Sequence, residues 1–329
     1  MIDHIRLGGF TVRKGVVWAS MAYEPCEARF PSRLTRLLAL EKINLPFFTC
    51  SAAGHGCAVD VAVEREKWDK AATLIADNFK TFRLRIEKRG VIASVFPHGR
   101  NPSIAANVLR AIDGAGAIHY AAAQSNSAFS VLIGEEKLQA FAEALFTCFR
   151  FRAYPTVAEW ESRRAPVTVP KEIVASYQEK RPKVYSLDWY EGIDLLKLEN
   201  RPGSGGTAAE ALESMAADGE TTEFLGGGGP PPATLTLAAA SSRKATGLVL
   251  DRPYPVAVFT MNGPHFGDRY GIAAELMNAL EREGIEVLAV TCNMASITGI
   301  IPEDQVSQAI GAITACFEVP LVSRAYSKS

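Results

Sequence analysis

The side chains that could carry out chemistry are few in this sequence and scattered along it. The five histidines, at positions 4, 55, 98, 119 and 265, lack the spacing of metal ligands, so we predict no metal site. The six cysteines occur singly, without a C-x-x-C pair, which favours reduced thiols over disulfides. We find no phosphate-binding glycine loop, no dinucleotide-binding glycine motif and no G-x-S-x-G nucleophile turn. These patterns predict a protein that is not an enzyme and has no cofactor.

The composition narrows the possible partners. A chain of 329 residues with 48% hydrophobic content can form two or more cores. The formal charge of −1 argues against nucleic acid or an anionic membrane as a partner. No segment approaches the roughly 20 apolar residues of a membrane span, and the N-terminus lacks the apolar run of a signal peptide. We therefore expect a cytoplasmic protein with no nucleic-acid or membrane partner.

An internal repeat must position any binding residues. Residues 104–149 and 272–317 follow the same pattern at a constant offset of 168. In each copy, a polar turn precedes a helix, two strands and a second amphipathic helix. Ser103 is expected to cap the first of these helices, and the corresponding turn in the second copy is three residues longer. The repeat predicts small β-α-β-β-α modules.

Two weaker copies precede the strong ones, at about residues 16–79 and 192–238. In the second of these, the run GGGGPPP (226–232) predicts a flexible loop. Each half thus holds one weak and one strong copy, so we infer that a pair was duplicated and that a binding cleft lies within each pair. The predicted boundaries are 1–82, 83–153, a linker at 154–182, 183–245 and 246–329.

This pattern resembles the ACT domain, a ferredoxin-like βαββαβ module that binds amino acids and regulates metabolic enzymes. The closest likeness is to the paired ACT modules of aspartokinases. Three stretches carry it: NRPGSGG (200–206), AIHYAAAQSNSAFSVLI (117–133) and IEVLAVTCNMASITGII (285–301). The resemblance implies an α+β fold of four ACT-like modules in two pairs. Because the chain leaves no room for a kinase domain, we expect a regulatory region without one.

The resemblance also implies where a ligand would bind, namely where the first strand-to-helix turn of one module faces a neighbouring module. Backbone N–H groups at a helix N-terminus attract a carboxylate, and side-chain oxygens can accept hydrogen bonds from an ammonium group. The candidate residues are His98, Asn101, Ser103, Ile104, His119, Gln124, Ser125 and Asn126 in the second module, and Asp268, Arg269, Tyr270, Gly271, Asn293 and Ser296 in the fourth.

Other interpretations remain open for the same residues. Asn101, Ser103 and Asp268 are also ordinary cap or turn residues, and glycines such as Gly271 often serve backbone geometry alone. We predict a non-catalytic, amino-acid-binding regulatory or sensor protein. The alternatives are a small-molecule enzyme with a site between the two halves, or an adaptor that regulates an amino-acid biosynthetic enzyme. The expected partners are an amino acid, a second copy in a homodimer, and a metabolic enzyme.

Overall fold

The computed structural model describes a mixed α/β fold built from repeated strand and helix units. The described residues are 5–23, 29–53, 56–79, 82–163, 181–200, 207–228, 233–240, 248–251, 254–263, 266–267, 269–293 and 296–326. None of the helices in these ranges is long and apolar enough to cross a membrane.

The first half of the chain contains thirteen of the described α-helices and strands. They are β1 (Ile5–Leu7), β2 (Gly9–Tyr23), α1 (Phe30–Leu40), β3 (Phe47–Ala53), β4 (Gly56–Glu64), α2 (Trp68–Asn78), β5 (Arg83–Phe96), α3 (Pro102–Gly114), β6 (Ala121–Gln124), β7 (Phe129–Gly134), α4 (Leu138–Cys148), β8 (Phe149–Phe151) and α5 (Val157–Arg163).

The second half follows the same order with fewer helices. Its elements are β9 (Ser186–Asn200), α6 (Thr207–Ala217), β10 (Thr222–Gly228), β11 (Ala233–Ala239), β12 (Leu248–Leu250), β13 (Val256–Asn262), α7 (Ile272–Arg282), β14 (Ala289–Asn293), β15 (Ser296–Pro302), α8 (Val306–Cys316) and β16 (Val322–Tyr326). The predicted repeat is confirmed, since α4 and α8 begin and end 168 residues apart.

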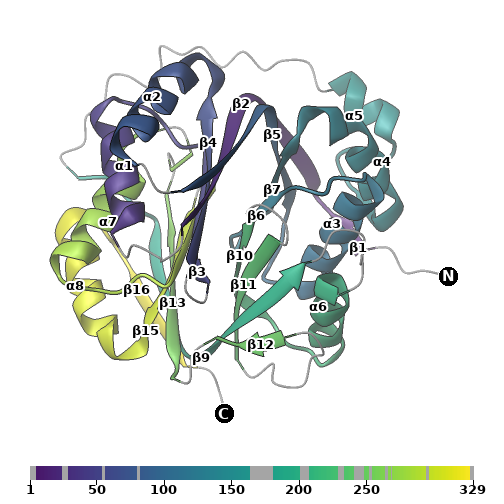
Figure 1. Ribbon diagram of the computed structural model, residues 1–329. Coiled ribbons are helices and arrows are strands. Elements are labelled where there is room, and N and C mark those ends of the chain that lie inside the picture. Colours follow the sequence, from purple (N-terminus) through teal and green to yellow (C-terminus); the bar gives the residue numbers. More distant parts are fainter. Residues whose placement is uncertain are drawn as a thin grey trace.

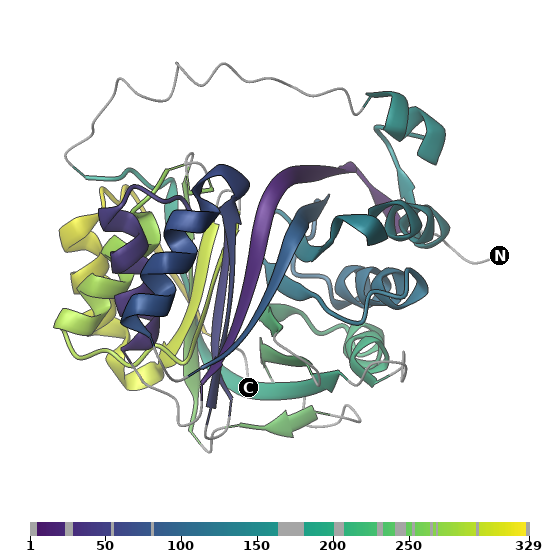
Figure 2. The ribbon, with the colours of Figure 1, turned by 45° about the horizontal axis from the view of Figure 1, so that its top comes forward.

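Twelve of the described strands form one continuous ring, while β1 and β8 pair in a separate two-stranded sheet. The order of the ring is β9-β11-β10-β6-β7-β5-β2-β4-β3-β14-β15-β13, and β13 pairs with β9 to close it. The ring is flattened into two facing sections with all the larger helices outside (Figures 1 and 2). Helices α1, α2, α7 and α8 cover one section, here called the α1/α7 side, and α3, α4 and α6 cover the α3/α6 side. Separate apolar clusters lie under each helix layer and between the sections.

Two long strands connect the sections. Strands β2 and β9 each have 15 residues, and each is bent by a glycine with positive φ, Gly15 (78°) and Gly192 (71°). The pairing of both strands shifts register close to these glycines, as expected for a β-bulge that increases local bending. The N-terminal part of β2 pairs only with the end of β5, whereas Val16–Tyr23 lies between β5 and β4 in the order β5-β2-β4-β3. That order is the ferredoxin-like one.

The prediction that a binding cleft lies within each half of the chain is wrong. Strand β3 pairs with β14 and α1 packs on α7, so the first part of the chain adjoins the last. In the same way β6 pairs with β10 and α3 packs on α6. Because β2 and β5 join the two modules of the first half, β3 and β6 are left at the far edges of the sheet. Strands from the second half cover those edges, and the helix–helix clefts therefore lie between the halves.

Two predicted flexible segments are partly ordered. The glycines of GGGGPPP begin inside β10, where a Cβ on Gly226 would lie 2.3 Å from Thr291 Cγ2 and one on Gly228 would lie 2.9 Å from Asp60 Oδ2. These glycines allow the two sheet sections to approach closely, so packing specifies them. The rest of that run lies outside the described residues. The predicted linker contains α5, whose Trp160 stacks on Phe10 at 4.5 Å.

Candidate functional site

On the α1/α7 side, the turn between β13 and α7 is held by residues from the start of the chain. Arg13 Nη1 donates to the Gly267 carbonyl at 3.1 Å, and Asn44 Nδ2 donates to the same oxygen at 2.7 Å. Beside this oxygen, Phe266 is buried in the core. The turn is therefore anchored across the interface between the two halves.

Helix α7 begins at this turn without a side-chain cap. Gly271 is the N-cap residue, with φ 90°, and has no side chain that could accept from the first N–H groups of the helix. These groups carry the positive end of the helix dipole and can bind an anion. A narrow cavity of about 10 Å³ adjoins this end, about the size that holds one water molecule. It is lined by Thr35, Ile43, Asn44, Leu45, Phe266, Arg269, Gly271, Ala273, Ala274 and Cys292.

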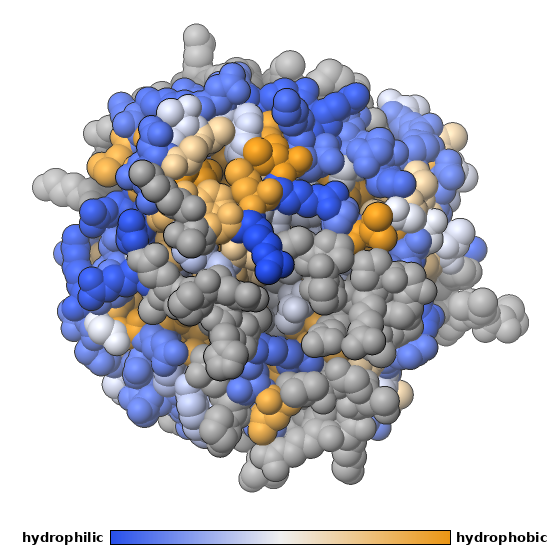
Figure 3. Space-filling view, viewed as in Figure 1, coloured by the Kyte–Doolittle hydropathy of each residue, from blue (hydrophilic) through white to orange (hydrophobic). Residues whose placement is uncertain are grey.

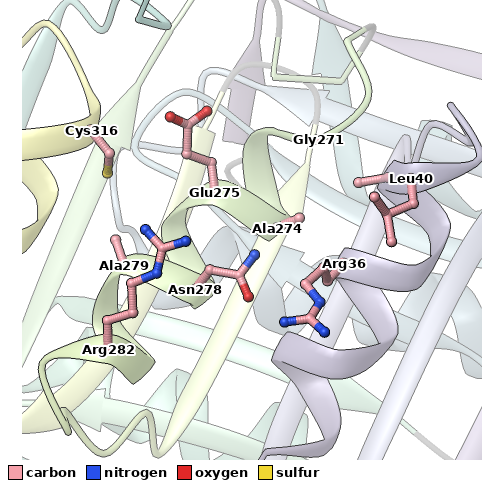
Figure 4. A pocket seen from close by; sticks show the side chains of 10 residues that line it. Arg36, Leu40, Gly271, Ala274, Glu275, Asn278, Ala279, Arg282 and Cys316 are labelled. Carbon is pink, nitrogen blue, oxygen red and sulfur yellow. The ribbon is translucent and has the colours of Figure 1, made fainter.

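A larger open groove of about 390 Å³ lies on the other side of Gly271, between α1 and α7 and reaching the end of α8 (Figure 4). Alanines of α1 and α7 form part of its wall, and charged side chains project around it. Among the residues that the structure describes, Arg36, Glu275 and Arg282 have no opposite charge within 4 Å. Burial raises the pKa of Glu275, and the nearby positive charges of Arg269 and Arg282 oppose that rise.

Side chains also bridge α1 and α7 themselves, because Glu281 pairs with Arg29 at 3.3 Å and accepts from Ser32 Oγ at 2.5 Å. The α3/α6 side differs in the turn before its first helix. Arg100, in the turn before α3, forms an ion pair with Glu223 of β10. The Arg100 guanidinium also lies 4.7 Å from the centre of the Tyr190 ring. The Thr222 N–H donates to the Arg100 carbonyl at 3.1 Å. This turn is thus joined to β10 by both its backbone and its side chain.

Further contacts close the same side. Gln124 Nε2 donates to the Thr222 carbonyl at 2.6 Å, and Thr222 Oγ1 donates to Gln124 Oε1 at 2.7 Å. Arg110 of α3 and Glu213 of α6 pair at 2.6 Å across the helices. Helix α3 is also capped, because Asn101 Oδ1 accepts from the Ser103 N–H at 2.9 Å. The N-cap is therefore Asn101 and not Ser103 as expected, since α3 already begins at Pro102.

His98 is buried under this closed turn. Its side chain is 1% exposed, and its ring stacks on Phe129 at 5.5 Å. Within the described residues neither ring nitrogen has a well-aligned hydrogen-bond partner. Burial lowers the pKa of His98 to about 4, and backbone groups of Ser125 and Asn101 offset this only in part. The ring is therefore neutral at pH 7.

The structure brings only some of the predicted residues together. Arg269 and Gly271 line the cavity at α7, and Tyr270 lies beside them, exposed. Asp268 lies outside the described residues. Ile104 is part of the apolar core under α3. His119 contacts Arg85, away from the turn before α3.

The strand-turn residues mostly hold the fold together. Ser125 closes its own hairpin by bonding with both backbone groups of Ala128. Asn126 accepts the Gly99 N–H at 3.1 Å, and its side chain bonds to Tyr190. Asn293 Nδ2 donates across the sheet sections to the Ala123 carbonyl at 3.0 Å, and its Oδ1 accepts from Ser296 at 2.9 Å.

The expected position of Asn293 and Ser296 beside the fourth-module turn is not observed. Side chains alternate along β14, so Cys292 faces the helices and lines the cavity while Asn293 faces the space between the sections. Sequence reasoning also missed the residues that the first part of the chain contributes, chiefly Arg13, Thr35 and Asn44. No periodic pattern marks them, because they become neighbours only when the two halves pair.

Comparisons with known proteins identify the family of the domain that contains α7. A model of the ACT domain family matches residues 252–315, so β13, α7, β14, β15 and most of α8 form an ACT domain. No curated protein matches the sequence. An aspartate kinase from Synechocystis superimposes on 95% of this chain and 56% of its own, with a TM-score of 0.75 and 15% identity. At that identity the likeness shows the fold alone.

Shorter matches come from two regulatory subunits of aspartate kinase. The subunit from Thermus thermophilus is 17% identical over 44% of this chain and 99% of its own, with a TM-score of 0.39. The one from Thermus flavus is 16% identical over 42% of this chain and 97% of its own, with a TM-score of 0.37.

The match to the Synechocystis enzyme contradicts the expectation of a non-catalytic sensor protein. The structure that superimposes on nearly the whole chain is an aspartate kinase, so neither the purely regulatory interpretation nor the expectation that the protein is not an enzyme is supported. The chain spans little more than half the length of that kinase, 56%. The expected lack of a kinase domain is not confirmed. The chain contains an ACT domain, and its fold is that of an aspartate kinase region.

Proposed function

We propose that this chain carries the ACT regulatory modules of an aspartate kinase, in which an amino acid bound on the α1/α7 side controls the phosphorylation of aspartate. The superposition on an aspartate kinase over 95% of the chain supports the type of enzyme. The match of residues 252–315 to the ACT domain supports control by a small molecule. We further infer that the remaining strands and helices form three more ACT-like modules.

One observation carries the choice of site, namely the groove with unpaired charges beside the uncapped end of α7. A free amino acid carries a carboxylate and an ammonium group. Arg36 and Arg282 suit the first and Glu275 suits the second, and all three line the same groove. The helix N-terminus at Gly271 adds a further attraction for the carboxylate.

The small cavity next to Gly271 indicates that binding involves movement of the turn. Its volume of about 10 Å³ is too small for an amino acid. The turn that bounds it is held chiefly by the two hydrogen bonds that Arg13 and Asn44 donate to Gly267. We expect a ligand that enters from the groove to displace Gly271 and to lengthen or break these bonds. A change in the relative orientation of α1 and α7 would then transmit ligand binding to the rest of the enzyme.

The test measures aspartate-dependent ADP formation by the aspartate kinase that contains this chain, with each standard amino acid added in turn. We expect turnover that one or a few amino acids change. The effect should be lost in Glu275→Gln and kept in Glu213→Gln, a matched carboxylate on the α3/α6 side. Absence of aspartate-dependent turnover would overturn the kinase assignment. An amino-acid effect that survives Glu275→Gln would overturn the assignment of the groove.

A further inference from the structure

The layer between the two sheet sections differs from the layers beneath the helices. The helices bury two large apolar clusters against the outer faces of the sections, and the surface over these helices is mainly hydrophilic on the side seen in Figure 3. Between the sections the described residues form two small apolar clusters, one around Phe224 and Val258 and one around Trp18 and Phe47. Much of the remaining layer consists of polar side chains and glycines.

A row of polar side chains crosses the inner face of the α1/α7 section. Each lies directly opposite the next on neighbouring strands, in the order Ser20, Asp60, Thr49, Thr291, Thr298 and Thr260, and all six are at most 2% exposed. On the same layer, the buried hydroxyls of Ser51 and Thr236 have no hydrogen-bond partner among the described residues. Because an unpaired buried hydroxyl lowers stability, the sections are held together less firmly than the helices are held to the sheets.

Asp60 lies where the two sections approach each other closely. Strand β10 of the second half packs against β3 and β4 of the first half, and a Cβ on Gly228 would lie 2.9 Å from Asp60 Oδ2. Trp18 Nε1 donates to Asp60 Oδ1 at 2.9 Å, and Thr49 Oγ1 lies 3.5 Å from Asp60 Oδ2. The side chain of Asp60 is 0% exposed. This contact therefore leaves no space for the hydration shell of an ionised carboxylate.

The groups that face Asp60 provide no positive charge. Those of the described elements are uncharged, namely Trp18 and Ser20 of β2, Thr49 of β3 and Gly228 of β10. Residues 229–232, which follow Gly228 in the sequence, have no titratable side chain. One strand further along the same face, Arg85 lies opposite Ser20 and Glu87 lies opposite Trp18. Burial accordingly raises the pKa of Asp60 to about 6, against the hydrogen bonds from Ser20, Trp18 and Thr49.

We propose that the contact of β10 with β4 is a pH-dependent latch between the two sheet sections, closed when Asp60 is protonated and released when Asp60 is ionised. Protonated Asp60 can donate to a neighbouring hydroxyl oxygen and fits the dry contact. Ionised Asp60 requires water, which it reaches when β10 withdraws. A carboxyl whose pKa is higher in the closed state favours that state most at low pH, so closing weakens as the pH rises through about 6. The latch does not depend on the proposed amino-acid site.

The test follows amide hydrogen exchange of β10 in the full chain between pH 5 and pH 8, with rates corrected for their intrinsic pH dependence. We expect the protection of Thr222–Gly228 to fall about tenfold, because release returns the carboxyl toward its ordinary pKa of 3.8. In Asp60→Asn, which keeps all five histidines, this protection should not change with pH. Asp113→Asn removes a carboxyl of α3 whose pKa is also raised by burial, and should keep the response of the unaltered protein.

Gly228→Ala gives a second check that requires no change at Asp60. The added methyl group would contact Asp60 Oδ2, so β10 should be as weakly protected at pH 5 as at pH 8. Gly311→Ala on α8 is the control, because a Cβ there would meet nothing within 4 Å, and it should leave the protection of β10 unchanged. A cooperative melting transition at pH 5 establishes that each variant is folded.

Four outcomes would overturn the proposal. They are protection of β10 that does not change with pH, a pH response that survives Asp60→Asn, and full protection of β10 in Gly228→Ala. The fourth is an equally large fall in the protection of α8, which would mean that the whole chain unfolds as the pH rises. Loss of the amino-acid effect on turnover, by contrast, would leave the latch unaffected.

Discussion

The two sides of the molecule have the same architecture, but their polar side chains are arranged differently where the helices of the two halves meet. On the α3/α6 side, Arg100 pairs with Glu223, and Gln124 exchanges hydrogen bonds with Thr222. On the α1/α7 side, the N-cap of α7 is a glycine, and the groove holds charges of both signs that form no ion pair within 4 Å among the described residues. The difference suggests a division of labour, in which the turn before α3 is fixed by side chains of β10 and the groove beside α7 is left to receive a ligand.

The largest expected effect comes from the buried His98 on the closed side. Its folded-state pKa of about 4 is lower than the ordinary 6.5, so its contribution to stability is present above pH 6.5 and is lost as the pH falls toward 4, by about 3 kcal/mol. Asp60, buried between the sheet sections, has the opposite sign. Burial raises its pKa from 3.8 to about 6, against hydrogen bonds such as that from Trp18, so its contribution is lost as the pH rises over that range.

Because these two effects cancel in part, they are measured in separate variants. In Asp60→Asn, the free energy of unfolding should fall by about 3 kcal/mol between pH 6.5 and 4. In His98→Leu, with Asp60 intact, it should rise over the same interval. Denaturant titrations at several pH values give both slopes. Equal slopes in the two variants would mean that His98 is not held neutral by the closed interface.

A matched pair of arginine substitutions tests the difference between the two sides more directly. Arg100→Met removes the partner of Glu223, whose side chain is only 7% exposed, and should lower stability by about 2 kcal/mol. Arg36→Met removes an arginine that has no ion pair among the described residues and should change stability by less than about 0.5 kcal/mol. Denaturant unfolding measures both. Equal losses would show that the two interfaces are equally fixed.

A smaller effect sharpens the same contrast. Thr222→Val removes the hydroxyl that donates to Gln124 Oε1 and should cost about 1 kcal/mol, because the buried amide oxygen is left without that donor. The control is Thr73→Val on α2, whose exposed hydroxyl donates to the Asp69 carbonyl of the same helix at 3.0 Å. Its melting temperature should stay close to that of the unaltered protein. A shift as large as that of Thr222→Val would show that the loss in Thr222→Val does not come from the buried hydrogen bond to Gln124.

Local patterns in the sequence predicted the elements well. The offset of 168 holds for α4 and α8 to the residue. These features depend on side-chain periodicity within one short segment, which a single sequence contains.

The partners of those elements could not be predicted in the same way. Strand pairing such as β3 with β14 depends on which sheet edges remain open after β2 and β5 have paired, and no repeat records that. Gly226 was taken for part of a flexible loop because its role is a contact with Thr291, 65 positions away in the sequence. The contacts that Gln124 and the turn before α3 make with Thr222 and Glu223 could not be predicted for a related reason, since these residues meet only across the two halves.

The most direct test of the central claim is a melting screen of the protein against each standard amino acid, run in parallel on Arg36→Met and Arg110→Met. These arginines occupy α1 and α3, the two helices that face the opposite half of the chain. We predict that one or a few amino acids stabilise the unaltered protein, by about 2.7 kcal/mol at a hundredfold excess over Kd. The shift should disappear in Arg36→Met and persist in Arg110→Met. A flat profile for all amino acids, or a shift lost in Arg110→Met but kept in Arg36→Met, would contradict the account.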